Sequence, residues 1–150
     1  MKNRLIGIIG LGYVGLPLAA AFASKYEVVG FDINIKRIKE LNKGLDVTNE
    51  LTSEQLDKVV RTSLKLTTDL EDVANCTIFI VTVPTPVTSN KTPDLTPVIK
   101  ATESVSSILK KGDTVVYEST VYPGVTEEVC IPILEEKTGL KFNVDFFVGY

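Results

Sequence analysis

The chain has 150 residues, of which 44% are hydrophobic and 23% are charged, and its formal net charge at pH 7 is −3. This length and composition predict one soluble globular domain with its own hydrophobic core and exclude a disordered chain. Because the chain is weakly acidic, it lacks the general basic surface of nucleic-acid-binding proteins, and nucleic acid is not expected as a partner.

The first predicted elements are a strand over residues 5–9 and a helix over residues 14–24. Between them stands Gly10-Leu11-Gly12-Tyr13-Val14-Gly15, which has the glycine spacing of a dinucleotide-binding turn. We expect Gly10 to make the tight turn out of the strand, Gly12 to let the backbone approach a pyrophosphate, and Gly15 to let helix and strand pack closely. The unpaired N–H groups and positive dipole end of the helix would favour an anion at the same place.

This N-terminal segment also imitates a secretory signal, because Lys2 and Arg4 precede an apolar stretch that ends at Ala21-Phe22-Ala23-Ser24. Glycines and Pro17 interrupt any continuous apolar helix in that stretch, and the dinucleotide-binding pattern explains the same residues more completely. No run of 18 apolar residues occurs, so we expect no membrane span and a cytoplasmic protein.

The second predicted strand, over residues 28–33, carries an acidic residue, Asp32, about 20 residues after the glycine turn. In dinucleotide-binding folds an acid at this place accepts a hydrogen bond from the ribose 2′-hydroxyl of NAD and repels the 2′-phosphate of NADP. We therefore expect NAD as the cofactor. Lys36 and Arg37 qualify this expectation, since a guanidinium near the adenosine could bind a phosphate or stack on adenine.

The remaining predicted strands and helices alternate along the chain. Strands are expected at 64–67, 77–83, 114–118 and 146–148, and helices at 35–42, 53–61, 96–110 and 125–136. This alternation predicts an α/β fold of the Rossmann type, a doubly wound parallel sheet of about six strands with helices on both faces. The long loop from Pro84 to Pro97 is the kind of loop that often serves a site.

Polar residues follow two of these strands at their carboxyl ends. Thr85 stands in Pro84-Thr85-Pro86 after the strand at 77–83, and Ser119 and Thr120 follow the strand at 114–118. If the strand order is 3-2-1-4-5-6, these residues lie beside the glycine turn at the topological switch point, where Thr85 would face the cofactor. The alternatives are that the prolines merely end a strand and that the hydroxyls cap a turn.

Only two cysteines occur, Cys76 and Cys130, and the chain contains no histidine. Their spacing does not match a metal site, so no metal is expected, and we interpret them as two buried thiols in a reducing cytoplasm. Without histidine the chain cannot form a Ser-His or Cys-His catalytic pair.

Several segments together resemble one family across essentially all 150 residues. They are residues 10–15, Phe31-Asp32, Leu41-Asn42-Lys43-Gly44, Val83-Pro84-Thr85-Pro86 and Glu118-Ser119-Thr120, and they resemble the UDP-glucose/GDP-mannose dehydrogenase family. The segment from Tyr117 to Glu128 is most similar to the branch that acts on UDP-N-acetylhexosamines, including enzymes of Vi-antigen-type polysaccharides. In the UDP-glucose branch a lysine more often stands where this chain has Glu118.

The resemblance implies a two-step, four-electron oxidation of a sugar C6 alcohol to a carboxylate. Such a reaction consumes two NAD, passes through a cysteine-bound thiohemiacetal and thioester, and makes a UDP-uronic acid for capsule or surface polysaccharide. By motif, the backbone at Tyr13 and Val14 would meet the pyrophosphate, and Asp32 and Arg37 the adenosine ribose. The resemblance places Thr85 and Thr120 at the nicotinamide half and gives Thr120 a catalytic part in ordering a water.

The family's nucleophilic cysteine and its lysine, asparagine and glutamate partners would lie beyond residue 150. Residues 1–150 are therefore expected to be a NAD-binding domain that lacks the central helical domain and the C-terminal UDP-sugar domain, and to bind NAD without turnover. We expect the full-length protein to be a homodimer and this chain to be a monomer or weak dimer. The alternatives are a hydroxyacid or phosphogluconate-type dehydrogenase domain and a non-catalytic dinucleotide-binding module.

Overall fold

The fold is seen in a computed structural model that describes residues 5–150. Lys2 and Arg4, the charged residues of the signal-like pattern, lie outside this range. Within residues 5–150 no helix is long and apolar enough to cross a membrane.

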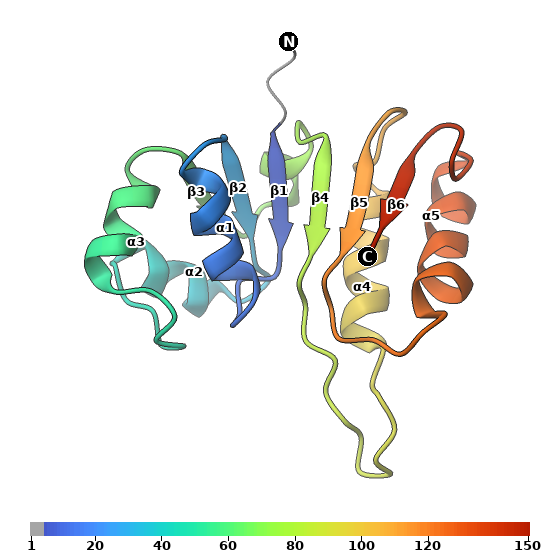
Figure 1. The fold of residues 1–150 in the computed structure, drawn as a ribbon, viewed down its shortest axis with the longest axis horizontal. Helices are drawn as coiled ribbons and strands as arrows, with labels where there is room; N and C mark the ends of the chain where they lie inside the picture. The colour runs from blue at the N-terminus through green and yellow to red at the C-terminus, as the bar shows by residue number, and fades with distance from the viewer. Residues whose placement is uncertain (1–4) are drawn as a thin grey trace.

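A single parallel sheet of six strands forms the centre of the molecule, in the order β3-β2-β1-β4-β5-β6 (Figure 1). This is the predicted 3-2-1-4-5-6 order, so the predicted Rossmann-type fold is confirmed. The strands are β1 (Ile6–Ile9), β2 (Val28–Phe31), β3 (Leu64–Thr67), β4 (Ile78–Val81), β5 (Thr114–Tyr117) and β6 (Phe147–Gly149).

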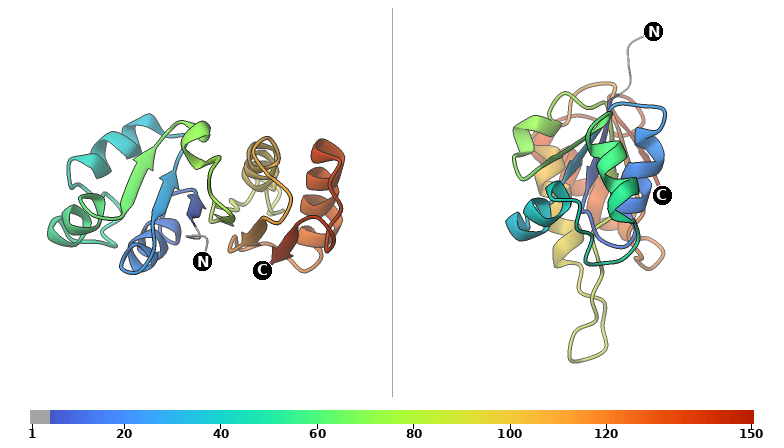
Figure 2. Two further views of the ribbon diagram at one scale, coloured as in Figure 1. Left: turned by 90° about the horizontal axis from the view of Figure 1, so that it is seen from above. Right: turned by 90° about the vertical axis from the view of Figure 1, so that its left-hand side faces the viewer.

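Helices flank the sheet on both faces, with α1 on one face and α4 on the other (Figure 2). They are α1 (Gly15–Ala23), α2 (Ile35–Asn42), α3 (Ser53–Val60), α4 (Thr96–Ser106) and α5 (Ile131–Thr138), with a short 3₁₀ turn, η1 (Leu70–Val73), and a π turn, η2 (Thr126–Cys130). Buried residues of α1, α2 and α3 pack with Ile6, Ile8 and Val28 in one core cluster. Residues of α4, α5 and η1 pack with Ile9, Phe79 and Val115 in the other.

This division into two clusters follows from the strand pattern. Successive side chains of a strand point to opposite faces, so Ile8 and Ile9 belong to different cores. A buried parallel strand must therefore be apolar at nearly every position, as β1 and β4 are.

Two helices end or begin differently from the sequence expectation. α4 ends at Ser106 rather than Lys110, where the hydroxyls of Ser106 and Ser107 donate to the carbonyls of Glu103 and Ser104. Such bonds compete with helix propagation.

The predicted helix at 125–136 instead opens as the π turn η2 and continues to Thr138. Pro132 accounts for the wide turn, because it has no N–H to donate and its ring crowds the carbonyl of Glu128.

The loop between β4 and α4 projects beyond the carboxyl ends of the strands (Figure 1). Its arms are held together by a bridge between Val87 and Pro93 and by a 2.7 Å hydrogen bond between the hydroxyls of Thr88 and Thr92. The tip extends away from the body of the molecule, and only the base of the loop lies against the sheet edge.

Candidate functional site

A cleft of about 980 Å³ lies at the carboxyl edge of the sheet, beside the topological switch point between β1 and β4. Open α/β sheets bind their ligands at this place. The glycine turn and the end of β2 line the cleft, together with the base of the β4–α4 loop and one side of α4 along its whole length. Its lining includes Gly10, Gly12, Asp32, Arg37, Val83, Pro84, Thr96, Lys100 and Ser104.

The glycines of the turn differ in what surrounds the place where a side chain would stand. A Cβ added at Gly15 would lie 1.8 Å from the carbonyl oxygen of Gly10, so the fold itself requires this glycine. A Cβ added at Gly12 would meet no atom of residues 5–150 within 4 Å. The protein alone therefore gives no reason for the glycine at 12, whereas a ligand seated against the backbone would.

Among the described residues, the N–H groups just before α1 have no hydrogen-bond acceptor. Val14, the residue before the helix, makes no side-chain cap, and no acidic residue stands in the first turn. Across residues 5–150, no backbone or side-chain acceptor is found for the N–H groups of Gly12, Tyr13 and Val14. These donors and the positive end of the helix dipole fit an anionic group such as a pyrophosphate.

Asp32 follows β2 and stands at the wall of the cleft. Its Oδ2 accepts a 2.9 Å hydrogen bond from the N–H of Leu11, and its Oδ1 accepts a 2.8 Å bond from the N–H of Asn34. Each carboxylate oxygen has a further lone pair. The side chain thus fixes the glycine turn and can still accept a hydroxyl; its bond to a ribose stays a prediction.

Arg37 lies in the first turn of α2 and is 6% exposed. Its Nε donates to the carbonyl oxygen of Leu11 (2.9 Å), its Nη1 to Oδ1 of Asp46 (2.8 Å) and its Nη2 to the hydroxyl of Thr48 (3.2 Å). The guanidinium is therefore held at the wall of the cleft by three protein acceptors and is not a free surface cation. A direct bond from Arg37 to the ribose stays a prediction.

Asp46, in the loop between α2 and α3, was not among the residues singled out from the sequence. Its side chain is fully buried against Arg37. Burial acts to raise the pKa of this carboxyl, but hydrogen bonds from Thr48, Leu51 and Arg37 outweigh burial and hold the pKa well below its usual value. The only sequence signal was an acid two residues before a threonine, the pattern of an Asx turn.

Thr85 and Thr120, predicted on two separate loops, are brought together. The two hydroxyls lie 3.1 Å apart, and that of Thr85 also lies 2.9 Å from the carbonyl oxygen of Thr120. The hydroxyl of Ser119 donates to the carbonyl of Val83 (2.7 Å) and ties the same two loops. Thr85 and Thr120 stand at the carboxyl edge but outside the lining of the cleft, and their roles toward a cofactor stay predictions.

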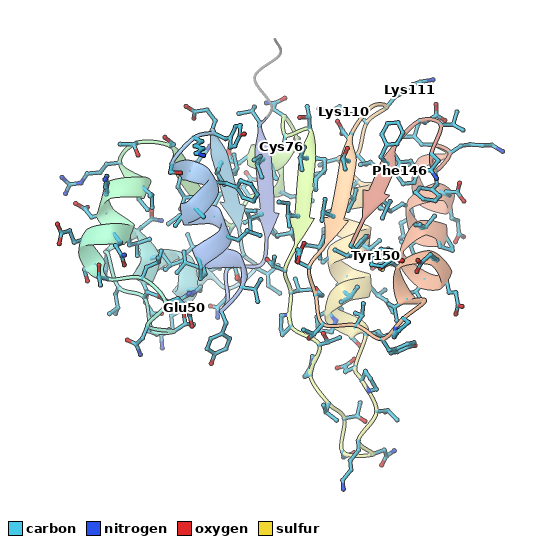
Figure 3. All side chains as sticks on the ribbon, in the orientation of Figure 1. Glu50, Cys76, Lys110, Lys111, Phe146 and Tyr150 are labelled. Carbon is cyan, nitrogen blue, oxygen red and sulfur yellow. The ribbon has the colours of Figure 1, made fainter. Side chains whose placement is uncertain are left out.

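The two cysteines are free and buried, as predicted. Figure 3 shows Cys76 beside Lys110 at the amino edge of the sheet, opposite the projecting β4–α4 loop. Burial, with a contribution from Asp113, raises the pKa of the Cys76 thiol to about 11, and burial also raises that of Cys130. Within residues 5–150, no group of three or more potential metal ligands is found.

Comparison with known proteins identifies similar sequences over nearly the whole chain. Residues 4–150 match the family model described as the UDP-glucose/GDP-mannose dehydrogenase family, NAD binding domain. UDP-N-acetyl-D-glucosamine 6-dehydrogenase of Pseudomonas aeruginosa is 55% identical over 100% of this chain and 35% of its own length. The enzyme of that name from Salmonella typhi is 57% identical over 97% of this chain and 34% of its own length.

Solved structures agree with these sequence matches. The UDP-D-ManNAc dehydrogenase of Pyrococcus horikoshii superposes with a TM-score of 0.91 at 39% identity, over 97% of this chain and 35% of that one. The chain thus spans about a third of the length of the curated relatives it matches. The match favours the nucleotide-sugar dehydrogenases over the hydroxyacid-type alternative.

Proposed function

The chain belongs to the UDP-glucose/GDP-mannose dehydrogenase family, as its NAD-binding domain, and on that premise we propose that the whole protein is a NAD-dependent UDP-N-acetylhexosamine 6-dehydrogenase. The reaction would oxidise the C6 alcohol of the sugar to a carboxylate in two steps. Each step takes two electrons to one NAD, so that two NAD are reduced for each sugar. NAD, when bound, supplies the hydride acceptor.

One observation carries the cofactor part of this proposal. Gly12 borders the cleft, and among residues 5–150 no atom fills the place of its missing side chain and no acceptor is found for its N–H group or for those of Tyr13 and Val14. Asp32 stands at the wall of the same cleft. A dinucleotide offers a pyrophosphate for the N–H groups and a ribose diol for the carboxylate, so both features are explained by one ligand.

The residues of the chain then have separate tasks in our proposal. The backbone at Tyr13 and Val14 binds the pyrophosphate, and Asp32 and Arg37 hold the adenosine end. The hydrogen-bonded pair Thr85 and Thr120 supports the nicotinamide end of the cofactor. The hydroxyl of Thr120 also helps to position a water at that end.

The rest of the reaction would be carried by parts of the protein outside this chain. We propose that residues 1–150 act with a central helical domain and a UDP-sugar domain, which would supply the nucleophilic cysteine and the sugar contacts. Neither Cys76 nor Cys130 has the exposure or the thiolate character that a nucleophile needs. We further propose a cytoplasmic homodimer that makes a UDP-uronic acid for surface polysaccharide.

The test is turnover by the full-length protein with a panel of nucleotide sugars. UDP-N-acetylglucosamine with NAD should give NADH and a uronic acid in a ratio of two to one, measured by absorbance and by mass spectrometry. UDP-glucose and GDP-mannose are the controls within the family, and lactate is the control outside it. Turnover of UDP-glucose in preference to every N-acetylhexosamine would overturn the substrate assignment while leaving the family intact.

A further inference from the structure

The loop between α2 and α3 is built around the carboxylate of Asp46. Its Oδ1 accepts hydrogen bonds from the N–H (3.0 Å) and hydroxyl (2.6 Å) of Thr48, and its Oδ2 accepts from the N–H groups of Glu50 (2.8 Å) and Leu51 (3.0 Å). The Nη1 of Arg37 adds an ion pair at 2.8 Å. A buried carboxylate with this many donors is well satisfied and firmly placed.

Asp46 is joined to the glycine turn through Arg37. The same guanidinium that pairs with Asp46 donates from its Nε to the carbonyl of Leu11, 26 residues away along the chain. At the other end of the same residue, the N–H of Leu11 donates to the carboxylate of Asp32. The backbone of Leu11 is therefore held at both ends, by a carboxylate at its N–H and by a guanidinium at its carbonyl.

The bond at the Leu11 carbonyl fixes a peptide plane that matters for the site. That carbonyl belongs to the same peptide group as the N–H of Gly12, the first of the three N–H groups for which the described part of the chain offers no acceptor. If the carbonyl is held, the orientation of the peptide that leads into Gly12 and Tyr13 is held as well. Preorganised donors bind an anion better than donors that must be ordered on binding.

We propose that Asp46 is a positioning residue for NAD: it locks the Arg37 guanidinium against the Leu11 carbonyl and so holds the glycine turn in its binding conformation. This inference rests on the proposed function, because it takes the turn to be the pyrophosphate site. Asp46 itself borders no part of the cleft. Without its carboxylate, Arg37 is left as a buried cation that turns toward water and gives up its bond to Leu11.

The experiment compares Asp46→Asn with Asp145→Asn in the full-length protein. Asp145 is the matched control: it pairs with Lys111 at 2.8 Å and accepts the N–H of Lys141 at 3.0 Å, but it follows α5 near the start of β6, away from the cleft. NAD affinity is measured by calorimetry at a temperature where circular dichroism shows every variant folded. Asp46→Asn should weaken NAD binding about tenfold, and Asp145→Asn by less than about twofold.

A second measurement separates positioning from loss of loop structure. In an Arg37→Met background, Asp46→Asn should weaken NAD binding further by less than about twofold, because Asp46 acts through Arg37. The amide resonance of Gly12 in the ligand-free protein should also move in Asp46→Asn and stay in place in Asp145→Asn.

The outcomes separate this inference from the proposed function. If wild-type protein binds NAD and Asp46→Asn binds it equally well, the positioning role is wrong and the cofactor site stands. If Asp46→Asn weakens NAD binding by the same factor in the Arg37→Met background as in the wild type, the route through Arg37 is wrong. If wild-type protein binds no NAD, both the site and this inference are overturned.

Discussion

At the scale of single residues, Gly12 and Gly15 separate what the ligand requires from what the fold requires. Gly12→Ala places a methyl group in open space, so the free energy of unfolding should change by less than about 1 kcal/mol, while NAD affinity falls at least about tenfold. Gly15→Ala drives a Cβ into the carbonyl of Gly10 and the hydroxyl of Thr82, and should cost about 2–4 kcal/mol of stability. Urea unfolding and calorimetry measure the two effects. A Gly12→Ala variant with normal NAD affinity would contradict our account of the turn.

Asp46 should make the stability of the protein depend on pH in the acid range. The native pKa of its carboxyl lies below the unfolded value of about 3.8, so its stabilising contribution is complete above that value and is lost as the pH falls through and below it. The difference in unfolding free energy between wild type and Asp46→Asn should be constant from pH 7 to about pH 5 and then shrink toward pH 2. The measurement is urea unfolding at a series of pH values; a difference that grows in acid would have the wrong sign.

The sequence pointed to the site residues whose spacing is local and missed those whose partners are distant. Asp32 was predicted because its distance from the glycine turn is a regular feature of one strand-helix-strand unit. Arg37 was predicted near the adenosine, but its buried position was not, because it depends on Asp46 and Leu11 meeting it in space. No periodicity in the sequence reports such a contact.

At the scale of an element, the start of α3 offers a test of local stability that is separate from the site. The hydroxyl of Thr52 accepts from the N–H of Gln55, and the Gln55 side chain accepts from the N–H of Thr52. Thr52→Ala should therefore cost about 1 kcal/mol of stability and leave NAD affinity unchanged. Thr62→Ala, just past the end of the same helix, is the control, because that exposed hydroxyl only bonds back to carbonyls of its own chain segment. Equal losses for both variants would mean that the capping box contributes nothing.

The order and type of the elements were predictable, but their ends were less so. Alternating apolar strands and amphipathic helices admit few topologies, since crossovers between parallel strands are right-handed. The ends depend on single bonds: the N–H of Asp32 still donates to Thr67 and that of Thr82 to Ile9, one residue past the observed strands. The short turn η1 carries no periodic pattern and was missed.

At the scale of the whole molecule, burial of both thiols predicts a native protein that resists thiol reagents. With a pKa of about 11, the Cys76 thiol is ionised in roughly one molecule in a thousand at pH 8, and it is 2% exposed. Cys130 is fully buried. A chain of residues 1–150 should not react with a disulfide reagent until denaturant is added, when two thiols per chain should appear. Rapid reaction of the native chain would show that this packing is wrong.

The central claim, that the cleft at the switch point is a NAD site, is tested most directly by calorimetric titration of the full-length protein with NAD and with NADP. Our account predicts one site per chain for NAD, with NADP at least about tenfold weaker because its 2′-phosphate meets the carboxylate of Asp32. It also predicts that Gly12→Ala loses most of the NAD signal. Equal binding of the two cofactors, or NAD binding that Gly12→Ala leaves intact, would contradict it.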